Sequence, residues 1–433
     1  MMDSVEYSGL RQYLLSSGTR ESRVRKELWS CNGISYATYR KYLNHVREFG
    51  FPEEQDLSSP SMAVYLRRSS ADKLPAYPGG GHRSRPSKLP AVYSFSGVRH
   101  ILDDCKSSIT VVSYGHLSTE LLAYGSADGK VWVATLGVDT KVKKLDGGHT
   151  KEVQDLDWSM DNSLLLTCGL EGCVCLWSVD KGVLFRKFTF KNPPHGCRFH
   201  ALNQNLIFVA SGGDMMVYNG STGSEAMRHN IIPASLGDHI TAVASSNTFL
   251  FVGDSGGTLH MLKWELRSGV LKPLSLCYHV SHPLGKESAV SGIQHQGYTS
   301  ITKGAGLLVT YADSTVGIYK VHDGSSMWPE LMIKCTMPPA ARRINAVWCP
   351  PANPTESEHI AMGGEDTNVH VYDVTRVKSV PVVVNELQAH AVPVVAVCWS
   401  FDELGLASGD CEGTVIVWKR NDSETSSRRT TSM

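Results

Sequence analysis

The chain has 433 residues, of which 42% are hydrophobic and 19% are charged, so it is long enough to bury a large core. Its 42 basic and 42 acidic residues cancel, although residues 1–90 hold 14 basic against 9 acidic residues, leaving 28 against 33 for the remainder. No apolar run approaches the roughly 20 residues of a membrane helix or reaches secretory length at the start. We therefore expect an intracellular protein without membrane contact.

Residues 1–90 are predicted to form a basic arm. Within "ISYATYRKYLNHVREFGF", Tyr36, Tyr39, Leu43 and Val46 recur at helical spacing, which indicates a short amphipathic helix. Residues 57–90 are rich in Ser, Pro, Gly and basic residues, a composition typical of a flexible linker. Three interpretations of the arm remain open: a solvated tail, a protein-docking helix, or contact with nucleic acid or an anionic membrane. Because its excess of five charges is small, nucleic acid is not expected as a direct ligand.

A repeated phrase runs from about residue 108 to residue 418. Its clearest copies are "GGHTKEVQDLDWSMDNSLLLTCGLEGCVCLWS" (residues 147–178) and "QAHAVPVVAVCWSFDELGLASGDCEGTVIVWK" (residues 388–419). A repeat of roughly 40 residues with three apolar strands and Gly/Asp-rich turns is typical of propeller blades. The first strand of the phrase occurs seven times, at residues 108–114, 153–158, 197–202, 240–245, 290–295, 344–349 and 394–399. The sequence therefore predicts an all-β fold, a seven-bladed propeller spanning residues 91–420.

A fourth strand can be identified in six blades but not in the last, where residues 421–433 follow as a polar tail that we expect to be disordered. The ring has to be closed, and an N-terminal strand can supply the missing outer strand of the last blade. Residues 91–102, "AVYSFSGVRHIL", have the aromatic, alternating character of a strand. We expect them to close the ring, with Tyr93 and Phe95 packed into the seventh blade.

The repeats resemble the WD40 family. That family often joins a His before the first strand, a Ser/Thr on the second, an Asp in the turn and a Trp ending the third in a buried hydrogen-bond network. The resemblance implies such networks here, with Glu in place of Asp and the hydroxyl missing in the second and seventh blades. The residues carried over are His149, Glu171 and Trp177 in the second blade, His390, Asp410, Glu412 and Trp418 in the seventh, and Asp128, Asp313 and Asp366 in the first, fifth and sixth. We interpret all of them as structural, because an unpaired buried imidazole costs about 1–3 kcal/mol.

The resemblance also implies a partner-binding rim around the mouth of the central channel, at the start of the first strands and before the turn acids. The rim positions in this sequence are Glu152, Gln154, Leu170, His239, Arg343, Asn345, Glu365 and Val395. Leu170 and Val395, with Pro393, supply an apolar stretch, and Arg343 beside Glu365 is expected to form an ion pair or to anchor a partner. Arg343 is the first candidate, because Arg is over-represented among interface hot spots. Each rim residue has the alternative of being an ordinary solvated side chain.

Catalytic constellations and metal motifs are not found in the sequence. The phrase "GDSGG" at residues 253–257 resembles a serine-protease nucleophile loop, but its register is that of a hairpin turn. Cys173 and Cys175 share one strand face, but no second Cys/His pair with zinc-ligand spacing accompanies them. We therefore expect no enzyme activity, no cofactor and no metal, and we interpret the eleven scattered cysteines as reduced core thiols.

The sequence thus favours a non-catalytic scaffold whose propeller rim assembles other proteins. The resemblance implies a nuclear regulatory complex, with the cytoplasm as a second compartment, and no small-molecule substrate. The alternative is a substrate receptor of a cullin-type ubiquitin ligase. Receptors of that kind carry a W-D-x-R phrase, whereas the nearest phrases here, "WSVDK" and "YDVTR", do not fit.

Overall fold

The protein was analysed in a computed structural model, and the regular elements of its described part are all β-strands. The structure describes residues 95–420, apart from positions 117, 201–202, 234–236, 247, 265, 268–269, 272–274, 300, 323–328, 350–358, 376–379 and 401–404. The predicted arm with its helix, the C-terminal tail and Tyr93 lie outside the described residues. Among the described residues, contacts separate residues 100–386 with 392–417 from residues 95–99 with 387–391 and 418–420.

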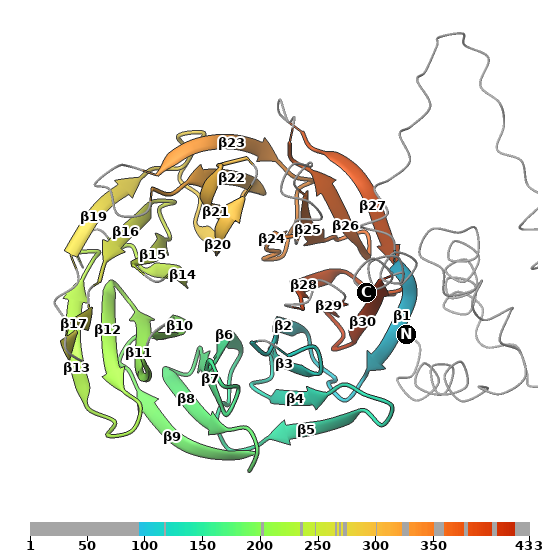
Figure 1. Cartoon of the computed structure of the whole chain (residues 1–433), viewed down its shortest axis with the longest axis horizontal. Coiled ribbons are helices and arrows are strands. Elements are labelled where there is room, and N and C mark those ends of the chain that lie inside the picture. The colour runs from blue at the N-terminus through green and yellow to red at the C-terminus, as the bar shows by residue number, and fades with distance from the viewer. Residues whose placement is uncertain are drawn as a thin grey trace, which may run out of the picture. The chain divides into compact units, whose positions relative to one another are not determined.

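Seven four-stranded antiparallel sheets form the blades of a β-propeller, as the repeat predicted (Figure 1). The first three blades follow the chain without interruption. Blade one consists of β2 (Ile109–Tyr114), β3 (Leu121–Ser126), β4 (Val131–Thr135) and β5 (Lys141–Leu145). Blade two consists of β6 (Val153–Trp158), β7 (Leu164–Gly169), β8 (Cys173–Ser178) and β9 (Val183–Thr189). Blade three consists of β10 (Pro194–His200), β11 (Asn203–Ser211), β12 (Asp214–Asn219) and β13 (Glu225–Asn230).

Blade four carries an extra hairpin, and blades five and six return to the simple order. Blade four consists of β14 (Ile240–Ser245), β15 (Phe249–Asp254), β16 (Leu259–Lys263) and β19 (Ser275–Val280), with β17 (Leu266–Arg267) and β18 (Val270–Leu271) as the hairpin. Blade five consists of β20 (Val290–Thr299), β21 (Gly304–Tyr311), β22 (Thr315–Lys320) and β23 (Glu330–Thr336). Blade six consists of β24 (Val347–Trp348), β25 (His359–Gly363), β26 (Asn368–Asp373) and β27 (Val382–Gln388).

The seventh sheet joins the two ends of the described chain. Its order is β1-β30-β29-β28, with β1 (Phe95–Leu102), β30 (Val415–Arg420), β29 (Gly405–Asp410) and β28 (Val394–Trp399). The N-terminal strand therefore supplies the outer strand of this blade, as predicted. Phe95 on β1 is only 1% exposed.

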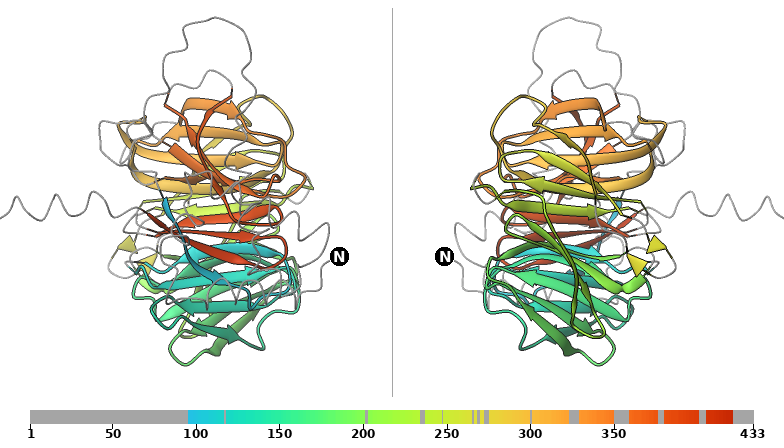
Figure 2. Two further views of the ribbon diagram at one scale, coloured as in Figure 1. Left: turned by 90° about the vertical axis from the view of Figure 1, so that its right-hand side faces the viewer. Right: turned by 90° about the vertical axis from the view of Figure 1, so that its left-hand side faces the viewer.

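The hydrophobic core lies between neighbouring sheets. One cluster joins Ala123 and Val133 of blade one with Leu156 and Trp177 of blade two, and similar clusters follow around the ring. The strands run across the thickness of the ring, so each sheet presents both faces to its neighbours (Figure 2). Burial of one Leu or Phe side chain contributes about 1.5–3 kcal/mol. Each blade is therefore stabilised mainly by the two blades beside it.

The strand bounds predicted from sequence hold for some blades and differ in others. The first strands predicted at 153–158, 240–245 and 394–399 coincide with β6, β14 and β28. The strand predicted at 344–349 pairs over only two residues, Val347–Trp348. Just upstream, the amide of Ala346 donates to the Thr310 hydroxyl of blade five (3.2 Å). This part of the chain is thus held by a side chain of the neighbouring blade, which periodicity does not reveal.

We expect Phe95→Ala to destabilise the protein by about 3–5 kcal/mol, because it removes a fully buried aromatic side chain from the closing strand. Arg99→Ala, at an exposed position of the same strand, is the matched control. The measurement is the midpoint of thermal unfolding by circular dichroism. Equal midpoints for the two variants would contradict a closing role for β1.

Candidate functional site

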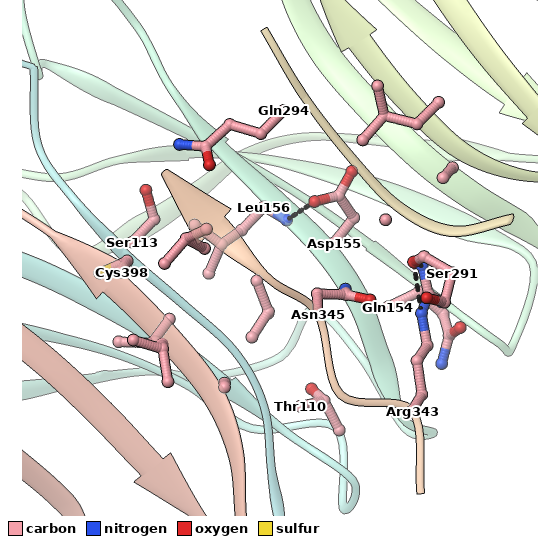
Figure 3. Close-up of a pocket in the computed structure, with 18 of the residues that line it drawn as sticks. Thr110, Ser113, Gln154, Asp155, Leu156, Ser291, Gln294, Arg343, Asn345 and Cys398 are labelled. Atoms are coloured by element: carbon pink, nitrogen blue, oxygen red, sulfur yellow. Dashed lines mark hydrogen bonds between the residues drawn. The ribbon is translucent and has the colours of Figure 1, made fainter. Parts of the chain in front are cut away.

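The first strands of the blades lie around the centre of the ring (Figure 1). They surround a cavity of about 750 Å³ in the central channel (Figure 3). Its volume is in the range of ligand pockets. Residues of β2, β6, β10, β14, β20, β24 and β28 all contribute to its wall. The polar side chains of Thr110, Gln154, Gln294 and Asn345 lie along the wall. The channel therefore combines an apolar framework with hydrogen-bonding groups.

Side chains along the wall bond the inner strand of one blade to the next. The Asp155 carboxylate on β6 accepts from the Cys197 amide of β10 (3.2 Å) and pairs with Arg198. Two residues on, Asp157 accepts from the Phe199 amide (2.7 Å). Burial raises the pKa of Asp157, while the charge of Arg198 acts in the opposite direction. These residues were not singled out from the sequence, because alternation on a strand does not show which neighbour an acid will reach.

The same kind of bond recurs elsewhere on the wall. The side-chain oxygen of Gln294 in blade five accepts from the Trp348 amide in blade six (2.7 Å). The hydroxyl of Thr241 in blade four donates to the carbonyl of Val290 in blade five (2.7 Å). Backbone groups at the free edges of the inner strands thus find partners in the neighbouring blade, which fixes the blades against one another.

Arg343 is a brace between blades. Its Nε donates to the carbonyl of Ser291 (2.8 Å; Figure 3). Its Nη2 donates to the carbonyls of Ser291 and Thr241 (3.2 Å for Thr241). Of the two roles expected for Arg343, the ion pair with Glu365 is not formed, and the role of a partner anchor stays a prediction. Glu365 instead accepts from Nη1 of Arg342 (2.6 Å) and from the Arg342 amide. The two adjacent arginines therefore bind different partners, and the sequence pattern alone does not predict which arginine pairs with Glu365.

The predicted rim residues divide into two groups. Glu152, Gln154, Arg343, Asn345 and Val395 line the cavity. Leu170, His239 and Glu365 do not belong to its lining, although the His239 ring lies 5.2 Å from the ring of His195, which does. The apolar stretch expected from Leu170 and Val395 is therefore not a continuous part of the cavity wall.

Blade two contains a complete hydrogen-bond network. His149 Nε2 lies 2.7 Å from the Thr167 hydroxyl, which also accepts from Trp177 Nε1 (2.9 Å). His149 Nδ1 bonds the Glu171 carboxylate. The expectation that this blade lacks the hydroxyl is wrong, because Thr167 on β7 provides it. Thr167 lies two residues before Gly169 on the same face of the strand, so the sequence pattern fits either position.

The Glu171 carboxylate can reach this network because residue 169 is a glycine. A Cβ on Gly169 would lie 2.7 Å from both the Glu171 carboxylate and His149 Nδ1, so the absence of a side chain leaves room for Glu171 to fold back. Blade six repeats the arrangement, since a Cβ on Gly364 would lie 2.2 Å from Asp366 Oδ1, and Asp366 bonds His370 (2.9 Å). A glycine followed two residues later by an acid thus places a carboxylate where a strand residue would otherwise stand.

In blade seven the acid stands on the strand itself. Asp410 is 1% exposed, and its carboxylate accepts from the amides of Glu412 (3.0 Å) and Thr414 (2.8 Å). Glu412 is exposed, so the expectation that Glu takes the place of Asp in this blade is wrong. The rings of His390 and Trp418 lie 6.4 Å apart.

The turn acids of blades one and five are paired with cations. Asp128 accepts from the Ser126 hydroxyl (2.5 Å) and lies 2.6 Å from Lys130. Asp313 lies 2.9 Å from Lys286. Burial acts to raise the pKa of each carboxyl, but the hydrogen bonds from lysine and hydroxyl groups prevail and lower it. These acids fasten turns and loops of their own blades.

Metal-ligand atom types meet at one place among the described residues. Ligand atoms of His149, Glu171 and Cys173 all lie within 4.8 Å of one another. His149 Nδ1 and Cys173 Sγ both bond the Glu171 carboxylate, and Cys173 Sγ lies 2.9 Å from Glu171 Oε1. Burial and the Glu171 charge raise the pKa of the Cys173 thiol to about 11, so it is protonated at neutral pH. The chemistry of the three groups fits a hydrogen-bonded cluster better than a metal site, which requires a thiolate.

The phrase "GDSGG" forms the turn between β15 and β16, as predicted. Ser255 donates to the Asp238 carboxylate (2.8 Å), and its oxygen accepts from the His239 amide (3.1 Å). This hydroxyl is thus bonded to an acid and a backbone group, as expected for a residue that stabilises the turn.

Among the described residues, no helix is long and apolar enough to cross a bilayer.

We expect Thr167→Val to lower the free energy of unfolding by about 1–3 kcal/mol, because it leaves the buried His149 and Trp177 groups without their shared partner. Thr150→Val is the control, since Thr150 is an exposed residue of the adjoining loop. Urea unfolding followed by tryptophan fluorescence measures the difference. A Thr167 variant as stable as the control would show that the hydroxyl is dispensable.

The Glu171 carboxylate makes a pH-dependent contribution to stability. Burial acts to raise its pKa, but the hydrogen bonds from His149 and Cys173 prevail and lower the pKa to about 2. Since the unfolded value is about 4.3, the stabilisation is fully present above about pH 5 and is lost as the pH falls toward 2. The stability difference between wild type and Glu171→Gln should therefore be constant from pH 6 to 8 and shrink below pH 5 in urea titrations. A difference that stays the same from pH 7 to pH 3 would refute this assignment.

Comparison with known proteins agrees with this architecture. The family model "WD domain, G-beta repeat" matches residues 140–178 and 381–419, the segments that contain His149 and His390. Cilia- and flagella-associated protein 57 of Mus musculus is 26% identical over 122 residues, covering 28% of this chain and 9% of that protein. The WD repeat-containing protein WDS homolog of Arabidopsis thaliana is 23% identical over 324 residues, covering 72% of this chain and 55% of that protein.

The chain thus spans less than two thirds of the length of either relative. Among solved structures, the β-propeller domain of Myceliophteria thermophila Cps50 (Swd1) superposes with a TM-score of 0.57 at 18% identity, covering 75% of this chain and 99% of that one. At this identity the likeness concerns the fold. The matched segments therefore identify WD40 repeats at residues 140–178 and 381–419, within a seven-bladed β-propeller.

Proposed function

We propose that the protein is a non-catalytic interaction scaffold that holds a peptide segment of a partner protein at the mouth of its central channel. WD40 propellers are typically protein-interaction scaffolds. The observation that carries the proposal is a set of unused hydrogen-bonding groups on the cavity wall. The side chains of Glu152 and Gln154 bond no described residue, and the buried side-chain oxygen of Asn345 has no partner there.

Such groups favour a polar ligand. A buried acceptor such as the Asn345 oxygen carries a desolvation cost of about 1–3 kcal/mol unless a ligand or water donates to it. The amides of an extended peptide supply donors at regular spacing. The cavity of about 750 Å³ holds a few residues of such a segment.

We infer a nuclear regulatory complex as the setting, with the cytoplasm as a second compartment. The inference rests on a finer resemblance, since "YSFSGVRHIL", "FVGDSGGTLHML" and "GGEDTNVHVYDV" resemble the corresponding phrases of WD repeat-containing protein 13. That resemblance implies a scaffold without enzymatic activity. We further propose other proteins as its ligands, with no cofactor and no small-molecule substrate; the small charge excess of residues 1–90 argues against nucleic acid as a direct ligand, and the lack of a long apolar run argues against membrane contact.

The double variant Glu152→Ala, Gln154→Ala should lose partners recovered by affinity purification and mass spectrometry. Neither side chain bonds a described residue, so the fold should be unaffected. The control is Lys144→Ala, Asp146→Ala, which removes an exposed ion pair (2.5 Å) from the outer part of blade one. An unchanged partner list in the channel variant would refute binding at the mouth. Stoichiometric recovery of a cullin-ligase adaptor would favour the alternative role of substrate receptor.

A further inference from the structure

We propose that the mouth of the channel contains an oxyanion site, formed by His195, His239 and Arg343, which binds one carboxylate or phosphate group of the docked peptide. The inference rests on the proposed function, because the anion belongs to the peptide in the channel. It goes further by assigning the chemistry of the group that is recognised.

Two imidazoles meet at this point. His195 lies on β10 and lines the cavity, and His239 directly precedes β14. Their ring centroids are 5.2 Å apart, with the ring planes inclined by 42°. The ring nitrogens of both residues make no hydrogen bond with a described residue. Each neutral ring therefore has an N–H available for a ligand.

Arg343 supplies a fixed cation on the same wall. Its Nε and Nη2 are tied to the carbonyls of Ser291 and Thr241, in blades five and four. Its Nη1 donates to no described residue, so two N–H groups remain for a ligand. Because the guanidinium is already held in place, little side-chain entropy is lost when an anion binds.

The electrostatic surroundings favour an anion over a metal ion. Burial, the neighbouring His239 and the charge of Arg343 lower the pKa of His195 to about 4, and no carboxylate is among the groups that act on it. The acids that act on Arg343 are Asp155, which pairs with Arg198, and Glu152. A divalent cation would meet the Arg343 charge with only two imidazoles as ligands. An oxyanion would relieve the same repulsion.

The binding of an anion should be coupled to proton uptake. An opposite charge close to an imidazole raises its pKa by about 1 unit or more. Since the bound form then holds more protons than the free form, affinity should be highest at low pH and decline as the pH rises through the raised pKa.

The site can be tested with inorganic phosphate and the full chain. The histidine Cε1–H resonances report the pKa of His195 by NMR, with chloride at equal ionic strength as the reference. Phosphate should raise that pKa by about 1 unit or more, and Arg343→Ala should abolish the effect. Arg342→Ala is the matched control, because Arg342 is the adjacent arginine and pairs with Glu365. An unchanged pKa of His195 in phosphate would overturn the proposal.

Because Arg343 also braces two blades, its variant can lose stability. His239→Asn provides a second test, since this side chain has no described hydrogen bond to lose. It should weaken phosphate binding at least about tenfold, as expected for loss of one charge-assisted bond. Binding unchanged in His239→Asn would also overturn the proposal, as would stoichiometric binding of Zn²⁺ that is lost in that variant.

The source of the anion is tested with short peptides. An acetylated and amidated hexapeptide of five alanines and one phosphoserine should bind at least about tenfold more tightly than inorganic phosphate, and the unmodified serine peptide, blocked at both ends, should bind at least about tenfold more weakly than the phosphopeptide. A phosphopeptide that binds no better than phosphate would overturn a peptide-borne anion. If the double variant of Glu152 and Gln154 loses partners but phosphate does not change the pKa of His195 in the wild type, the oxyanion site is refuted and the proposed function stands. Phosphate binding with an unchanged partner list would remove the proposed function instead.

Discussion

The structure depends on the burial of sheet faces between neighbouring blades. A single four-stranded sheet of this chain has apolar residues on both faces, as the cluster of Val133 with Trp177 illustrates. Neither face can be covered within its own blade, so stability requires a neighbour on each side. That requirement forces a closed ring. The strand β1, taken from before the first blade, completes the last sheet and removes the open end.

Closure creates the channel, and the channel creates the site. Inner strands have only one sheet neighbour, so their outer backbone groups must find other partners. Asp157 and Gln294 satisfy amides of the next blade, and Arg343 satisfies two carbonyls. Polar side chains of the wall that bond no neighbouring blade, including Glu152 and the oxygen of Asn345, are available for ligands. Recognition therefore uses the polar groups that the construction of the ring does not consume.

The blade networks show how far residue patterns can be trusted. The pairing of His149 with Glu171 and Trp177 in one blade follows from the resemblance, because the spacing within a repeat is nearly constant. The expectation that blade two lacks the hydroxyl was wrong, because residues two positions apart on a strand share one face and fit the pattern equally well. Gly169 and Gly364 are informative here, since each makes space for an acid two residues later. In both blades the acid reaches back toward the place that a side chain on the glycine would occupy.

The sequence by itself determined the number of blades, most strand positions and the identity of the closing strand, because each depends on local periodicity and turn chemistry. Five of the eight rim residues that it indicated line the cavity. Only the tertiary structure decided that Arg343 braces two blades while Arg342 pairs with Glu365, and that His195 and His239 meet. These contacts join residues tens of positions apart, and those of Arg343 and of His195 with His239 cross from one blade to another. Their geometry is set by how the sheets pack around the ring, which no local pattern encodes.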